Sequence, residues 1–359
     1  SPHPYLMEKI NDLSTPCFIL DPKELERSVR GFQEALNSKF GNSIVGYSVK
    51  TNSVPFCLKC AGKLGAYAEV VSSDEYELAL ACGFSKGNII YNGPLKSKET
   101  FIDAILHGAI VNIETKRELS WLKELPHDKK YNVGLRVNIN ISHVSPEDAD
   151  GENDNSRFGF SDETEELKDA LSFIEQIDNV ELAGLHIHRT THSRSVRFYK
   201  KSIEYACQTI KKYGLSINYL DVGGGFFGIF PNKPTYQQYS DAFYEVLSKF
   251  EMQNLCVIVE PGNALVASCF SFISEVIDVK HVEKELWFIT TNGSRNDIDP
   301  FFKKSTYLCE TVDYNKNRDI AKEQIVSGCT CLEYDRMHTL KNKPLLSVGD
   351  RIVYNTVGA

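Results

Sequence analysis

The chain has 359 residues, 42% hydrophobic and 25% charged, with a formal net charge of −8. These values suit a barrel plus a smaller domain, and the lack of Lys and Arg runs excludes the charge pattern of proteins that bind nucleic acid or anionic membranes. No stretch approaches the roughly 20 apolar residues of a membrane span, and the first residues carry no apolar signal core, so we expect a cytoplasmic protein with a small-molecule partner.

Short β-branched runs recur along the first 260 residues, each followed by helical periodicity. They predict strands at Ile44–Lys50, Ala66–Val71, Asn88–Tyr91, Ile110–Ile113, Val133–Ile139, Leu182–His188, Ile217–Val222 and Cys256–Glu260. The helices expected between them include Asp74–Ala81, Lys98–His107, Glu163–Gln176, Val196–Tyr213 and Tyr236–Phe250. Such repeated units predict an α/β fold, a (β/α)8 TIM barrel, rather than a doubly wound sheet, which normally has GxGxxG after its first strand.

The sequence pattern changes after Pro261: from there on, strands are expected without long helices between them. These strands are Leu265–Lys280, Leu286–Thr291, Gln324–Cys331 and Gly349–Thr356. We therefore predict a barrel over 23–264, a mostly β C-terminal domain over 265–359, and an N-terminal segment, 1–22, that packs on the β domain. The acidic, apolar-poor stretch 145–156 predicts a mobile loop.

Ten cysteines are spread through the chain, which fits reduced thiols better than a disulfide framework. Cys57 and Cys60 have the spacing of zinc ligands, but no second CxxC or paired His lies at the required distance. We expect an amphipathic helix there and no metal site.

Polar residues gather at the predicted strand ends, which carry the working residues of TIM barrels. The five polar strand ends are Tyr47–Asn52, Glu69, His186–His188, Asp221–Gly225 and Glu260–Asn263.

Four of these groups have a chemical interpretation, and three of the four also have a structural alternative. Lys50 follows an apolar strand, where a buried ammonium is costly unless it is paired or forms a Schiff base, although it could simply end the strand. Backbone amides of Gly223–Gly225 can hold a phosphate, or the glycines can form a tight turn. Glu260 would stay ionised beside a cationic ring nitrogen. His188 could stack on the same ring or be a core histidine bonded to backbone. Together the four groups indicate pyridoxal phosphate (PLP).

The motifs YSVKTN, HIH, DVGGGF, EPGNALV and CTCLEYD occur in an order that resembles the fold-type III PLP-dependent decarboxylases, the family of diaminopimelate and ornithine decarboxylases. The resemblance covers nearly the whole chain. It implies the barrel plus β domain that this family shares with alanine racemase, PLP as cofactor, and removal of the α-carboxylate of an amino acid.

The resemblance also assigns roles to individual residues. Lys50 would carry the cofactor, Glu260 would pair with the ring nitrogen, and His188 would stack on the ring. Glu69 and Ser72 would support the cofactor, while the phosphate side would involve Thr191, Gly224, Gly225, Gly262 and Asn263. Cys331 would be the general acid that returns a proton after carbon dioxide leaves. The family supplies this Cys from the neighbouring subunit, which implies a homodimer with shared active sites.

Departures from the family pattern cluster where the distal end of the substrate is expected. Asn263 replaces an Arg, Leu332 replaces an acid after the Cys, and Asp299 replaces the Arg of diaminopimelate enzymes. Glu333 and Asp335 remain as acids on the substrate side. The loss of two cations argues against the distal carboxylate of diaminopimelate, and the loss of the acid after Cys331 weakens the case for ornithine or lysine. We therefore expect a non-standard amino acid or an amino-acid conjugate as substrate. The family Tyr near the C-terminus has no counterpart before the chain stops at Val357-Gly-Ala, so we expect a missing tail.

Two alternatives stay open. A PLP-dependent amino-acid racemase would also need Lys50 and a phosphate site, but it usually places a Tyr opposite the Lys. A catalytically silent, decarboxylase-like binding protein would keep the fold and lose the catalytic groups. The presence of Lys50, His188, Glu260 and Cys331 together favours a decarboxylase.

Overall fold

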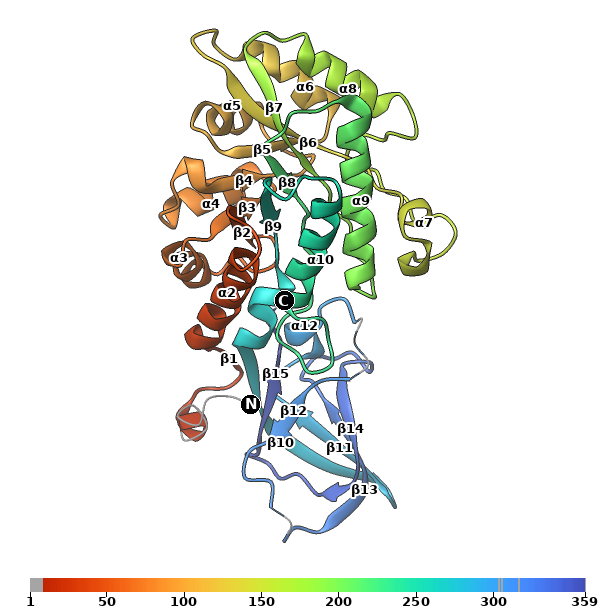
Figure 1. Ribbon diagram of the computed structural model, residues 1–359. Coiled ribbons are helices and arrows are strands. Elements are labelled where there is room, and N and C mark those ends of the chain that lie inside the picture. Colours follow the sequence, from red (N-terminus) through yellow and green to blue (C-terminus); the bar gives the residue numbers. More distant parts are fainter. Residues whose placement is uncertain (1–8, 303, 305, 316, 359) are drawn as a thin grey trace. The chain divides into compact units, whose positions relative to one another are not determined.

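The computed structural model describes residues 9–302, 304, 306–315 and 317–358 and shows two compact units (Figure 1). One unit is Leu25–Val266. The other joins the described residues up to Glu24 to those from Ala267 onward. Residues 1–8 of the expected N-terminal segment lie outside the described part of the chain. No helix in that part is both long and apolar enough to cross a membrane.

The larger unit is a closed barrel of eight parallel strands, which confirms the predicted fold. The strands are β2 (Ser43–Ser48), β3 (Tyr67–Val70), β4 (Ile89–Tyr91), β5 (Ile110–Ile113), β6 (Tyr131–Arg136), β7 (Val180–His186), β8 (Tyr219–Asp221) and β9 (Cys256–Val259). The barrel closes between β2 and β9, with Ile44 paired to Ile258. Several strands end earlier than predicted, so Lys50, His188 and Glu260 belong to the loops that follow them.

The helices of this unit are α2 (Pro22–Asn37), α3 (Pro55–Lys63), α4 (Ser73–Ala81), α5 (Lys98–Leu106), α6 (Lys116–Trp121), α7 (Ile141–Val144), α8 (Glu166–Glu175), α9 (Val196–Tyr213), α10 (Tyr236–Lys249) and α11 (Asn263–Val266). Long helices such as α9 and α10 cover the outside of the barrel, while α7 lies beyond α9 (Figure 1). Short 3-10 turns add η2 (Lys86–Asn88), η3 (Leu122–Glu124) and η4 (Pro146–Asp148). Helix α3 contains Cys57 and Cys60, as the helical interpretation predicted. The Ser72 hydroxyl accepts the Glu75 N–H, so Ser72 caps α4.

Tyr219 fills the centre of the barrel and explains two of its glycines. A Cβ on Gly134 would lie 1.9 Å from the Tyr219 hydroxyl oxygen, and one on Gly184 would lie 2.3 Å from its ring. Only glycine leaves room for this ring. The Tyr219 hydroxyl donates to Asn112 Oδ1 at 2.8 Å, which satisfies its polar end inside the core.

The predicted loop at 145–156 follows α7 and begins with the short 3-10 turn η4. It also contains a buried carboxylate, that of Asp148, which accepts several hydrogen bonds. Asp148 is buried and accepts hydrogen bonds from Ser145, Ser193 and Ser195, at 2.6, 2.6 and 2.7 Å. Arg197 forms an ion pair with the same carboxylate at 3.0 Å. The buried charge of Asp148 is compensated by the Ser145 hydroxyl and by donors at the start of α9. That the segment is mobile stays a prediction.

The smaller unit is a mostly β structure whose main sheet has the strand order β12-β15-β10-β11-β13-β14, with β1 paired to β10. Its strands are β1 (Cys17–Leu20), β10 (Phe270–Glu283), β11 (Leu286–Thr291), β12 (Cys309–Thr311), β13 (Ile320–Ser327), β14 (Arg336–Pro344) and β15 (Arg351–Asn355). The remaining elements are η1 (Ile10–Asp12), η5 (Ala267–Cys269) and α12 (Arg295–Ile298).

Two boundaries of the strands predicted for the β domain are wrong. Leu265 lies in α11, where its N–H donates to the Gly262 carbonyl, and the strand starts only at Phe270. The strand predicted to reach Cys331 ends at Ser327, because the chain then turns and the Gly328 N–H donates to the Asp335 carbonyl. Strand β14 was not predicted. It lies at the edge of the main sheet and is rich in polar residues, which removes the apolar alternation that marks a strand.

Candidate active site

A cavity of about 530 Å³ lies at the carboxyl ends of the barrel strands. Four residues that the sequence placed in a cofactor site line it together: Lys50, Glu69, His188 and Glu260. The rest of its lining is Val71, Asn92, Gly93, Pro94, Arg136, Asn155, Ser156, Arg157, Phe158, His186, Arg189 and Thr190. The cavity lies where the strand-end rule predicted a site, and the fold brings residues from the ends of six strands, β2, β3, β4, β6, β7 and β9, to it.

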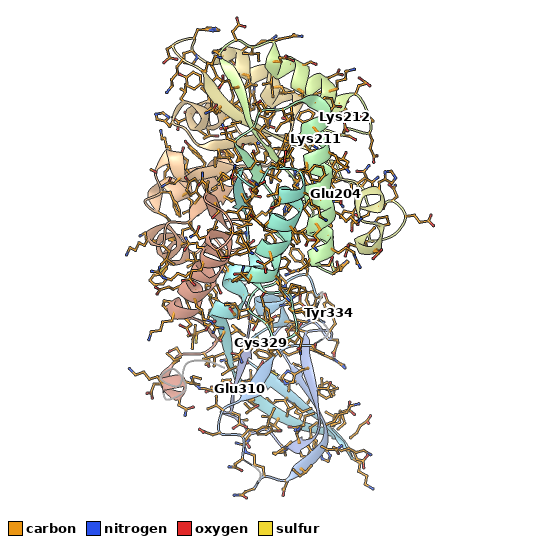
Figure 2. All side chains as sticks on the ribbon, in the orientation of Figure 1. Glu204, Lys211, Lys212, Glu310, Cys329 and Tyr334 are labelled. Atoms are coloured by element: carbon orange, nitrogen blue, oxygen red, sulfur yellow. The ribbon has the colours of Figure 1, made fainter. Side chains whose placement is uncertain are left out.

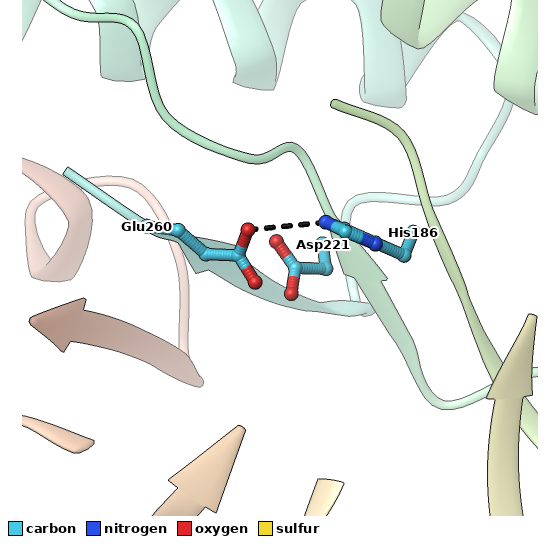
Figure 3. Close-up of side chains that lie close together, drawn as sticks. All are labelled: His186, Asp221 and Glu260. Carbon is cyan, nitrogen blue, oxygen red and sulfur yellow. Dashed lines mark hydrogen bonds and ion pairs between the residues drawn. The ribbon is translucent and has the colours of Figure 1, made fainter. Parts of the chain in front are cut away.

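Glu260 is buried directly after β9 and is hydrogen-bonded through both carboxylate oxygens. Its Oε1 lies 3.0 Å from His186 Nε2, and its Oε2 accepts from Asn92 Nδ2 at 2.6 Å. Figure 3 shows His186 and Asp221 beside this carboxylate. One ligand atom from each of these three residues lies within 4.8 Å of the others.

Glu260 and Asp221 differ in their protonation state. Burial by itself would raise the pKa of Glu260, but His186 and a hydrogen bond from Asp221 hold that pKa well below its usual range. Burial and the neighbouring Glu260 charge raise the pKa of Asp221 far above its usual range. Since two adjacent carboxylates cannot both ionise easily, the pair keeps one proton, on Asp221, and Glu260 is anionic.

His188 presents a neutral ring to the cavity. Burial, together with the charges of Arg136 and Lys50, lowers its pKa well below the usual value. Its Nδ1 accepts the Gly224 N–H at 3.0 Å, and a Cβ on Gly223 would lie 2.4 Å from the same nitrogen. The glycine run thus supports the imidazole from behind, and the Gly224 N–H is already committed to it.

Lys50 is exposed, contrary to the buried position that the sequence suggested, because β2 ends two residues before it. Glu69 is buried, and its Oε1 accepts from the Ser48 hydroxyl at 3.2 Å. Burial and Glu260 raise the pKa of Glu69 to about 8, against the opposing charge of Lys50. Glu69 Oε2 has no hydrogen-bond partner among the described residues.

The residues expected on the phosphate side do not line this cavity. The Thr191 hydroxyl accepts the Arg194 N–H at 2.9 Å, and Asn263 begins α11. Gly225 has a φ of +85°, and a Cβ on Gly262 would lie 2.1 Å from Thr51 Oγ1. A phosphate role for Thr191, Gly224, Gly225, Gly262 and Asn263 stays a prediction.

The remaining predicted residues belong to the β unit. Cys331 and Glu333 are exposed on the turn after β13, on which Figure 2 labels Cys329 and Tyr334. Asp335 is buried and accepts the Arg295 N–H at 2.8 Å and the Thr330 N–H at 3.1 Å. Asp299 accepts the Tyr307 hydroxyl and the Lys304 N–H, each at 2.8 Å. Both aspartates hold their own loops together, and their substrate roles stay predictions.

Sequence reasoning missed several cavity residues that hold the predicted ones in place. Asn92 bonds Glu260, while Arg136 pairs with Glu114 at 3.3 Å and donates to the His188 carbonyl at 3.0 Å. Both follow or end a barrel strand, so the strand-end rule, applied to β4 and β6, would have found them. Arg189 instead donates from Nη2 to Asp154 Oδ1 at 2.6 Å, and no local sequence pattern predicts this contact.

The residues present fit pyridoxal phosphate. A lysine amine faces the cavity, a buried anionic carboxylate is available for a ring nitrogen, and a neutral imidazole presents a flat surface. Residues 23–267 match the family model described as pyridoxal-dependent decarboxylase, pyridoxal binding domain. The chain belongs to this family. It is a decarboxylase, and its cofactor is pyridoxal phosphate.

Similar proteins agree with this assignment. A diaminopimelate decarboxylase of Aquifex aeolicus is 25% identical over 334 residues, which are 90% of this chain and 77% of the relative. A probable chloroplastic diaminopimelate decarboxylase of Oryza sativa is 28% identical over 358 residues, 96% of this chain and 71% of the relative.

Solved structures show the same fold. The diaminopimelate decarboxylase of M. jannaschii in complex with L-lysine has a TM-score of 0.85 and 21% identity, covering 99% of this chain and 84% of that one. The arginine decarboxylase of Paramecium bursaria Chlorella virus has a TM-score of 0.81 and 20% identity, covering 99% and 93%.

Proposed function

We propose that this decarboxylase removes the α-carboxylate of an amino acid or amino-acid conjugate other than diaminopimelate. The observation that carries the reaction type is the convergence of Lys50, His188 and Glu260 on one cavity. Pyridoxal phosphate, when bound, supplies a ring that accepts the electron pair left by the departing carboxylate.

The side chains of the cavity would each act on a different part of that cofactor. The Lys50 amine would hold it and exchange it for the amino group of the substrate. Anionic Glu260 would keep the ring nitrogen protonated, and the neutral His188 ring would lie against the face of the cofactor. Orienting the bond between Cα and the carboxylate perpendicular to that face selects decarboxylation over loss of the α-proton.

Cys331 would return a proton to the substrate carbon, and we propose that it does so across a homodimer with shared sites. The support is its exposure on the turn after β13 and the resemblance of CTCLEYD to the family motif.

The ten cysteines are all free thiols, which supports the proposed cytoplasmic location.

Diaminopimelate is the second candidate substrate. The proposal against it depends on Asn263, Leu332 and Asp299, whereas the named relatives are diaminopimelate decarboxylases. A structural observation also favours it: Arg157 lines the cavity over the Phe158 ring, at 4.3 Å from its centroid, and the described residues offer it no carboxylate partner. A distal carboxylate would supply one.

The substrate test is a screen for carbon dioxide release with the purified holoenzyme. Diaminopimelate, lysine, ornithine and arginine would be compared with amino acids that carry an amide- or amine-linked distal group. We expect fastest turnover with a member of the last group and none in Lys50→Ala. Fastest turnover with diaminopimelate would overturn the substrate proposal, and racemisation without carbon dioxide would overturn the reaction.

Shared sites can be tested by mixing two inactive variants. Lys50→Ala and Cys331→Ala homodimers should each lose activity. If each site draws Lys50 and Cys331 from different subunits, mixed dimers regain one intact site, and activity should return toward about a quarter of wild type. No recovery, with subunit exchange verified by mass, would refute the shared-site arrangement.

A further inference from the structure

Three barrel residues outside the family motifs form a hydrogen-bonded chain that ends on Glu260. Asn92 follows β4, Asn112 lies in β5 and Tyr219 lies in β8. Asn92 is 4% exposed, Asn112 is 0% exposed and Tyr219 is 8% exposed. Their contacts therefore operate without competition from bulk water.

Each link in this chain has a defined donor. Tyr219 Oη donates to Asn112 Oδ1 at 2.8 Å, and Asn112 Nδ2 donates to Asn92 Oδ1 at 2.8 Å. Asn92 Nδ2 then donates to Glu260 Oε2 at 2.6 Å. Asn92 cannot offer its carbonyl to Glu260 without breaking the bond from Asn112. The chain thus points donors toward the carboxylate, and a proton on Oε2 would place two donors face to face.

Tyr219 anchors the far end of the chain. Its ring is fixed by close contact with Gly134 and Gly184, so its hydroxyl cannot move away from Asn112. Asn112 Nδ2 also lies 3.4 Å from Oδ2 of Asp221, the carboxyl group that keeps the shared proton.

We propose that Asn92 is a positioning residue for Glu260, and that its amide selects the unprotonated carboxylate and turns it toward the cavity. Asn112 and Tyr219 fix the direction of that amide. The proposal rests on the proposed contact of Glu260 with the cofactor ring nitrogen. As a consequence, the hydrogen bonds from Tyr219 through Asn112 and Asn92 widen the pH range over which Glu260 can bind that nitrogen.

The titratable groups that face Glu260 must be considered in any pH test, and they are Glu69, His186, His188, Tyr219 and Asp221. They are common to wild type and to variants of Asn92, so a change confined to Asn92 isolates its contribution.

The test measures pyridoxal phosphate binding to apoprotein by equilibrium dialysis between pH 5 and 9. Asn92→Ala should weaken binding about 10- to 100-fold at pH 7, since a donor to a buried charge is lost. The acid side of its binding profile should move to higher pH, because Glu260 then holds a proton more readily. Tyr219→Phe should move the profile in the same direction by a smaller amount.

Asn88→Ala is the matched control, because Asn88 is exposed at the opposite end of the same strand. It should bind like wild type. If Asn92→Ala lowers affinity equally at every pH, or keeps the profile of the control, the positioning role is wrong even if thermal stability falls. Unchanged binding in Glu260→Gln would instead refute the proposed role of Glu260 itself.

Discussion

Lys96 and Glu118 form an ion pair whose two side chains are completely buried in the barrel unit. Lys96 Nζ lies 2.5 Å from Glu118 Oε1, 2.6 Å from the Gly93 carbonyl and 3.0 Å from the Asn112 carbonyl. Burial lowers the pKa of Lys96, and Glu118 opposes that shift. The pair therefore exists only because each charge compensates the other.

Replacing Lys96 with Met should be strongly destabilising. The change leaves Glu118 as an uncompensated buried charge and leaves two buried carbonyls without their ammonium donor. Breaking a buried pair in this way costs about 3–5 kcal/mol. In the double variant Lys96→Met/Glu118→Gln the uncompensated charge is gone, while the Gln carbonyl can still accept from the Thr115 hydroxyl. We expect the double variant to recover at least half of the loss.

The assay is urea unfolding followed by tryptophan fluorescence. The two tryptophans are Trp121, in α6, and Trp287, in β11 of the other unit. In a Trp287→Phe background the signal reports the barrel alone. Lys116→Met is the control, because Lys116 pairs with Glu166 at the surface, where the side chains are 74% and 47% exposed. Its midpoint should hardly move.

Two results would refute this reasoning. One is a loss below about 1 kcal/mol in Lys96→Met, which would mean that water or a rearranged side chain compensates Glu118. The other is a double variant no more stable than Lys96→Met, which would mean that lost packing rather than the uncompensated charge causes the damage.

Three further predictions concern pH. Hydrogen bonds from Arg197 and three serines hold the pKa of Asp148 below its usual range against the effect of burial, so Asp148→Asn should lower the urea midpoint at pH 7, with the difference shrinking as pH falls below about 4. Burial and the charge of Glu260 raise the pKa of Glu69 to about 8. Since the folded state then binds a proton more tightly than the unfolded state, wild type should lose stability as pH rises from about 4.5 to 8. The midpoint of Glu69→Gln should vary less over that range, and an equal slope would contradict the assignment. Burial lowers the pKa of His338 to about 4, so it should cost stability as pH falls from about 6.5 to 4, and His338→Gln should flatten that decline. An NMR titration showing His338 charged at pH 6 would rule this out.

The barrel strands and the place of the site were predictable from the sequence. Strands β4 and β9 lie where the apolar runs predicted them, because a parallel strand that is buried on both faces favours a continuous apolar segment. Once eight such runs alternate with helices, the carboxyl ends must converge, and Glu260 and His188 follow from that geometry alone. These features depend on patterns within about ten residues of one another.

Other features depend on partners far away in the chain. Strand β14 exists because β13 pairs with it, although its own residues are polar. Whether Asp221 or Glu260 keeps the shared proton depends on His186 and Asn92, which lie 74 and 168 residues before Glu260. The sequence by itself determined which residues stand at the strand ends. Only the tertiary structure decided their charges and hydrogen bonds, because burial and the approach of distant groups set the energy of a charge.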